Sequence, residues 1–156
     1  MKYTLLIFIL LFSACSIKDY KHTQTKIIII KSPKLKFADV GFIRNSKENI
    51  ELELFVAGKA IEKFTIEHLI CTTKGCMSKS GFNKDYLHVS YPDDILQDML
   101  LARPIYDAKN RVQTDDGFEQ LIKSRDVDIT YRVSSHVTYF KDRKNKIIFK
   151  IKDTEK

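Results

Sequence analysis

Apolar and polar residues alternate with a period of two over much of this chain, which is the pattern of half-buried β-strands. In the segment 50–56, Ile50, Leu52 and Leu54 alternate with Glu51 and Glu53. By the same criterion we predict strands over 27–30, 35–43, 50–56, 60–66, 128–134, 136–141 and 146–152. Four consecutive isoleucines at 27–30 predict a strand buried on both faces, and Gly41 predicts a bulge.

A helical pattern interrupts the strands in the middle of the chain. Ser80 predicts the cap of a short helix over 80–87, and Pro92 predicts the first turn of a longer helix over 92–101. Asp116 and Glu119 have the spacing of a capping box, which predicts a third short helix ending near Arg125. The expected fold class is therefore α+β: an antiparallel sheet of about six or seven strands, with two or three short helices inserted mid-chain.

The first fifteen residues have a different character. Lys2 precedes an unbroken apolar run over 5–12, and Ser13, Ala14 and Cys15 follow it. A charged start, a short apolar middle and a small-residue exit are typical of a secretory signal peptide. The run is too short for a retained transmembrane helix, which needs about 20 apolar residues.

A signal that ends in this way on Cys15 resembles the lipobox of bacterial lipoproteins, although Phe12 stands where that family usually has Leu. The resemblance implies that the Cys15 thiol takes a diacylglycerol group, that the signal is cut before Cys15, and that the new amino group is acylated, for example with palmitate. Ser16, in place of the Asp that favours inner-membrane retention in Gram-negative lipoproteins, implies the outer membrane of such a cell. The alternative is ordinary cleavage after Ala14.

These readings divide the chain into three parts. Residues 1–14 are the predicted lipoprotein signal peptide, 15–26 the lipidated N-terminus and its tether, and 27–156 a single globular α+β domain. About 142 residues remain after cleavage, enough for one domain with a sizeable core.

The chain carries a formal net charge of +7. For an exported protein, this charge favours anionic lipid head groups, anionic glycolipids or acidic envelope proteins as partners, besides the membrane reached through the anchor. Export argues against nucleic acid as a partner. The alternative is that the lysines only keep a small domain soluble.

Two cysteines remain once Cys15 is assigned to lipid. Cys71 and Cys76 flank a short loop that contains Gly75, and an oxidising compartment favours a structural disulfide between them. Four residues separate them, whereas a redox motif of the CxxC type has two. His68 and His88 flank the loop and leave a His–Cys–Cys–His metal set as an alternative.

No pattern in the sequence names a catalytic residue, a metal site or a cofactor. His136 follows Ser134 and Ser135, with Asp128 upstream, but these residues lie in a strand pattern without a nucleophile motif. Tyr86, Tyr91 and Tyr106 surround the helical segment and form a possible partner surface. We therefore expect a non-enzymatic binding or scaffolding lipoprotein of the envelope; the alternative is a small periplasmic enzyme or redox factor that uses Cys71 and Cys76.

Overall fold

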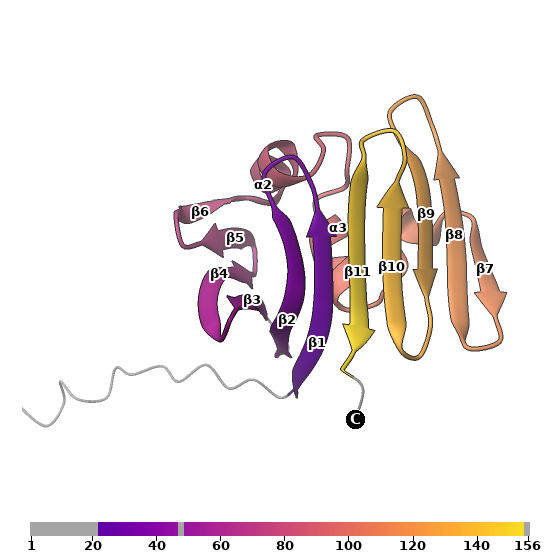
Figure 1. Ribbon diagram of the computed structural model, residues 1–156. Helices are drawn as coiled ribbons and strands as arrows, with labels where there is room; N and C mark the ends of the chain where they lie inside the picture. The colour runs from indigo at the N-terminus through magenta and orange to yellow at the C-terminus, as the bar shows by residue number, and fades with distance from the viewer. Residues whose placement is uncertain (1–21, 47–48, 155–156) are drawn as a thin grey trace, which may run out of the picture.

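The computed structural model describes residues 22–46 and 49–154, and within them eleven strands form one antiparallel sheet (Figure 1). The strand order is β6-β5-β4-β3-β2-β1-β11-β10-β9-β8-β7. The first and last strands therefore pair at the centre, and each half of the chain runs outward as a meander. The predictions for the signal peptide, for Cys15 and for most of the tether lie outside the described residues.

The N-terminal meander contains six strands and the C-terminal meander five. Their bounds are β1 His22–Lys31, β2 Lys36–Asn45, β3 Ile50–Val56, β4 Lys59–Ile66, β5 Leu69–Thr72, β6 Gly75–Ser78, β7 Arg111–Thr114, β8 Gly117–Lys123, β9 Asp128–Val133, β10 Val137–Asp142 and β11 Ile147–Asp153. The strands predicted over 50–56, 60–66, 128–134, 136–141 and 146–152 are confirmed within one or two residues.

A helical connection joins the outer strand β6 to the opposite outer strand β7. It consists of α2 (Lys79–Tyr86), α3 (Ile95–Leu100) and the 3-10 turn η1 (Tyr106–Ala108), and it passes behind the central strands in Figure 1. Four of the six residues of α3 are buried. This connection covers one face of the sheet, and the hydrophobic core fills the space between them.

The predicted α+β fold class is wrong. Among the described residues the structure is mostly β, with eleven strands in place of six or seven and only two short α-helices. The difference arises at the outer strands, because β5, β6 and β7 have four residues each and are too short to show a clear alternation.

The helix predicted from the Asp116–Glu119 spacing is also wrong, since this segment forms the β7–β8 hairpin. Within β8, Phe118, Gln120 and Ile122 are buried, which is a period of two. Gly117 is required by the pairing with β9: a Cβ atom there would lie 1.9 Å from the backbone oxygen of Val133. Tertiary pairing thus overrides the local capping signal.

Both helices that do form differ in detail from the prediction. Ser78, not Ser80, caps α2, and its hydroxyl accepts a hydrogen bond of 3.0 Å from the Gly81 N–H. The helix predicted over 92–101 shortens to Ile95–Leu100.

The central strand β1 begins at His22, within the segment predicted as a tether, and it is not buried on both faces. Ile28 and Ile30 are in the core, whereas Ile27 and Ile29 are half-buried on the other face. Gly41 causes no bulge; instead a Cβ atom there would lie 2.6 Å from the Ile28 side chain and 2.9 Å from the Glu53 backbone oxygen. The register shift in this half lies between Leu54 and Phe55.

The 3-10 turn η1 has an unusual backbone. Tyr106, Asp107 and Ala108 have φ angles of 49°, 52° and 60°, in the left-handed region that costs free energy for residues other than glycine. The buried amide of Gln120 holds this turn: it accepts from the Ile105 N–H at 2.9 Å and donates to the carbonyls of Ile105 and Lys109 at 2.9 and 2.7 Å. One side chain of the sheet thus fixes both ends of the strained turn.

Candidate binding cavity at the N-terminal end of the sheet

A cavity of about 440 Å³ lies where β1 begins and β11 ends. The end of α3 and the turn between β9 and β10 close its sides. The polar part of the lining comes from residues such as His22, Gln24, Asn45, His136 and Thr138. Ile43, Leu100 and Ile151 supply apolar wall, so the cavity combines hydrogen-bonding groups with apolar surface, as ligand-binding cavities commonly do.

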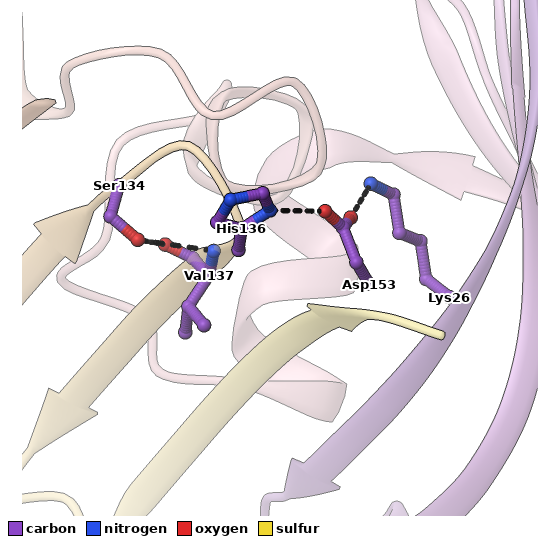
Figure 2. A network of polar contacts seen from close by, with 5 residues as sticks. All are labelled: Lys26, Ser134, His136, Val137 and Asp153. Carbon is purple, nitrogen blue, oxygen red and sulfur yellow. Dashed lines mark hydrogen bonds and ion pairs between the residues drawn. The ribbon is translucent and has the colours of Figure 1, made fainter. Parts of the chain in front are cut away.

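A polar network lies at the edge of this cavity and joins three parts of the chain (Figure 2). Lys26 and Asp153 are direct partners in the β1–β11 register, and the Lys26 ammonium donates to the Asp153 carboxylate. His136, from the β9–β10 turn, lies with Nδ1 2.9 Å from the other carboxylate oxygen of Asp153. The hydrogen bond from Lys26, followed by that from His136, lowers the pKa of the Asp153 carboxyl below its ordinary value.

The local sequence explains how the turn presents His136. The Ser134 hydroxyl accepts the Val137 N–H at 3.2 Å and donates to the Val137 carbonyl at 3.3 Å, which closes a tight turn. His136 lies inside this turn, with a side chain that is 77% exposed. With Nδ1 on Asp153, the ring directs Nε2 away from the carboxylate (Figure 2).

The Ser–His–Asp arrangement weighed in the sequence does not assemble. His136 pairs with Asp153, while Asp128 lies 3.6 Å from Arg143 at the other end of β9. The Ser134 hydroxyl is committed to the backbone of Val137. A hydrolytic nucleophile must hydrogen-bond to its base, and Ser134 and His136 do not form such a pair.

Cys71 and Cys76 form a disulfide, as the sequence predicts. They are directly opposed in the β5–β6 register, and Cys76 is exposed at the edge of the sheet. Because both thiols are in the bond, they are not ligands of a His–Cys–Cys–His metal set. His88 Nδ1 lies 2.7 Å from the Ser90 hydroxyl, and the described residues contain no cluster of three or more metal-ligating side chains.

The three tyrosines of the possible partner surface have different environments. Tyr91 is 4% exposed and donates its hydroxyl to Asp142 at 2.8 Å. Tyr86 stacks on Phe82 with ring centroids 4.6 Å apart. Tyr106 packs against the core, and burial, with the nearby Asp142 charge, raises its pKa to about 12. The structure does not bring them together as one exposed patch, and their role as a partner surface stays a prediction.

The sequence alone does not predict this cavity. Lys26 and Asp153 are 127 residues apart, and only the pairing of β1 with β11 makes them neighbours. A lone Lys and a lone Asp give no signal in a chain rich in both. His136 was singled out in the sequence, but as the first residue of the strand predicted over 136–141, which gives no sign of a cavity.

No protein-family model matches the chain, and comparisons with curated proteins and with solved structures give no match either. The functional argument therefore rests on the residues and the geometry described above. Within the described ranges, none of the helices has the length and apolar character needed to cross a bilayer.

Proposed function

We propose that this protein is a membrane-anchored envelope lipoprotein that acts as a non-enzymatic binding or scaffolding module. Its predicted attachment point is Cys15, and its predicted location is the outer membrane if the cell is Gram-negative. The proposal combines the lipobox resemblance with the position of the first described strand, β1.

One observation carries the proposal: His22 is both the first described residue of β1 and part of the cavity wall. His22 lies seven positions after Cys15 in the sequence, which is at most about 25 Å of extended chain. An acyl group on Cys15 therefore keeps the cavity within about 25 Å of the membrane surface. This arrangement suits a module that holds an envelope protein or an anionic glycolipid at the bilayer.

The anchor is tested on the native protein with Cys15→Ser as the matched variant. Mass spectrometry of the mature N-terminus is expected to show a chain that begins at Cys15 and carries diacylglycerol. The wild type is expected in the detergent phase of a Triton X-114 separation, and Cys15→Ser in the aqueous phase. A mature chain that begins with unmodified Cys15 contradicts the proposal.

The binding role is tested by site-specific photocrosslinking in intact envelopes. A photoreactive residue at position 136 is expected to crosslink to a defined partner, with a yield that saturates as the expression level rises. The same residue at position 89, which is 69% exposed in the loop after α2, is the control. Equal, unsaturable capture at both positions is the outcome that rejects a specific site at the cavity.

The alternative of a redox factor has one observation in its favour, the exposed Cys76 of the disulfide. A Cys71→Ser/Cys76→Ser variant distinguishes the two functions. An envelope role that survives this change, with only a loss of thermal stability, supports the binding module. Loss of that role in a variant that remains folded supports the redox factor.

A further inference from the structure

The face of the sheet opposite the helices is not covered by any described element, and Figure 1 looks onto it. The register places its side chains in rows across β2, β1, β11 and β10. One row contains Lys36, Lys31, Ile148 and Lys141, the next Ala38, Ile29, Lys150 and Tyr139, and the third Val40, Ile27, Lys152 and Val137. We call these three rows the open face.

The open face carries five lysines and no acidic residue: Lys31, Lys36, Lys141, Lys150 and Lys152. None of these lysines has an ion-pair partner among residues 22–46 and 49–154. The carboxylates on the flanking strands are already paired with other cations. On β3, Glu51 and Glu53 contact Arg44, and on β9 Asp128 lies 3.6 Å from Arg143. The positive charge of the open face is therefore uncompensated by the fold.

The top of the open face is slightly hollowed. A depression of about 380 Å³ is lined by Lys31, Lys141, Arg143 and Lys146, together with Ile148 and Asp142. The Asp142 carboxylate does not neutralise these cations, because it is buried and accepts hydrogen bonds from Tyr91 at 2.8 Å and Asn145 at 2.7 Å. Arg143 is paired with Asp128, so the three lysines around Ile148 form the seat for an anionic group.

Half-buried apolar side chains separate the lysines. Ile27, Ile29 and Ile148 occupy central positions on the open face, and each remains partly accessible. A soluble polyanion offers charge but little apolar surface for these side chains. The boundary between phospholipid head groups and acyl chains offers both.

We propose that the open face docks on an anionic phospholipid surface. This inference rests on the proposed function, because it uses the short distance in sequence from Cys15 to β1. It deepens that function by naming a second contact between the module and its membrane. The diacylglycerol predicted on Cys15 supplies the anchor, and a basic patch adds an electrostatic contact with an anionic leaflet that orients the domain. Each lysine near an anionic leaflet strengthens the attraction about fivefold, and salt weakens it.

The test is lysine acetylation, read by mass spectrometry, on the full chain reconstituted into vesicles. One set of vesicles contains phosphatidylglycerol and phosphatidylcholine, and the other only phosphatidylcholine. Lys31, Lys141, Lys150 and Lys152 are expected to react at least about fivefold more slowly in the anionic vesicles. Lys84 and Lys109, exposed on the helical connection, are internal controls with unchanged rates.

A Lys31→Gln/Lys150→Gln variant is expected to weaken docking about 25-fold and to restore acetylation of Lys141 and Lys152. Lys84→Gln/Lys109→Gln is the matched control that leaves the protection intact. Lys31, Lys84 and Lys109 are exposed and Lys150 is half-buried, and a thermal melt verifies that each variant is folded.

Equal acetylation of the open face in the two kinds of vesicle overturns the inference and leaves the lysines a role in solubility. Protection by soluble polyglutamate that equals protection by anionic vesicles overturns it in favour of an acidic macromolecule. Neither outcome affects the anchor, which is judged by the mass of the mature N-terminus. An unlipidated N-terminus with a protected open face would refute the anchor alone.

Discussion

The two halves of the sheet are both meanders that run outward from the central β1–β11 pair, yet different interactions stabilise them. The N-terminal half carries an ion-pair ladder on the open side of β2, β3 and β4, where Arg44 lies 2.6 Å from Glu51 and 2.8 Å from Glu53. Its outermost hairpin is closed by the Cys71–Cys76 disulfide. The polar contacts of this half thus lie on the open side of the sheet, where Arg44 and Lys63 remain partly exposed although Glu51 itself is buried.

The C-terminal half depends on polar side chains inside the core. Asp142 is fully buried and accepts from Tyr91, from Asn145 and from the backbone N–H groups of Asp128 and Lys144. Gln120 holds the left-handed turn η1, and the Tyr131 hydroxyl donates to the Arg103 carbonyl at 2.9 Å. Buried polar groups cost far more when left unpaired than surface ion pairs contribute. The C-terminal half should therefore be the more sensitive to single substitutions.

The largest effect is expected for Asp142→Ala. The substitution leaves the Tyr91 hydroxyl, the Asn145 amide and several N–H groups without their acceptor, and the free energy of unfolding should fall by about 4 kcal/mol. Urea denaturation followed by circular dichroism measures the change. Asp126→Ala removes an exposed carboxylate near the same hairpin and should change stability by less than about 0.5 kcal/mol. Similar losses of unfolding free energy for the two variants would contradict a stabilising role of the buried network around Asp142.

Low pH should reduce the free energy of unfolding through the same carboxylate, that of Asp142. Burial would raise the pKa of Asp142, but hydrogen bonds from Tyr91, Asn145 and the backbone outweigh it and hold this pKa below its ordinary value. A lowered folded-state pKa contributes stability above the unfolded pKa of about 3.9, and this contribution is lost as the pH falls through the folded value. Asp142→Asn should flatten the decline of unfolding free energy between pH 5 and about pH 2. An unchanged pH profile would exclude Asp142 as its source.

Gln120→Ala should cost about 3 kcal/mol, because it unpairs the Ile105 N–H and the carbonyls of Ile105 and Lys109 beside the strained turn. Hydrogen exchange should show faster exchange at the Ile105 amide. Gln113→Ala, on the exposed neighbouring strand β7, is the control with little effect on either measurement. Retained protection at Ile105 would show that the turn does not need Gln120.

Removal of the disulfide in a Cys71→Ser/Cys76→Ser variant should lower stability by about 2 kcal/mol on the chain-entropy estimate for so small a ring. The loss is moderate because β5 and β6 remain paired through their backbone. A thermal melt of the variant against the wild type measures it. A loss larger than that of Asp142→Ala would reverse the proposed order of the two halves.

The smallest effects are expected at the surface ion pairs. Lys63→Gln should cost about 0.5–1 kcal/mol, since its partner Glu51 is 7% exposed and lies 2.7 Å away. Arg132→Gln should cost less than about 0.5 kcal/mol, because its pair with Glu119 is more exposed. Denaturation at low and at high salt compares the two, and only the Lys63 effect should exceed the error of the measurement.

The strands that carry a clear alternation can be predicted from the amino-acid sequence alone. Segments such as 50–56 and 146–152 have enough residues for the period of two to be read, and both are strands. The spacing of Cys71 and Cys76 also predicted their disulfide, which the structure confirms. These features are local, because each is set by neighbouring residues whose spacing is visible in one dimension.

Features that depend on contacts between distant segments became visible in the folded protein. The tertiary structure turned 117–123 from a predicted helix into β8, because Phe118, Gln120 and Ile122 face the core once β9 pairs alongside. It also placed Lys26 beside Asp153 and gathered the unpaired lysines on one face, by joining the first strand to the last. The physical reason is that strand pairing and burial are set by partners far away in the chain, which the local pattern of one segment does not identify.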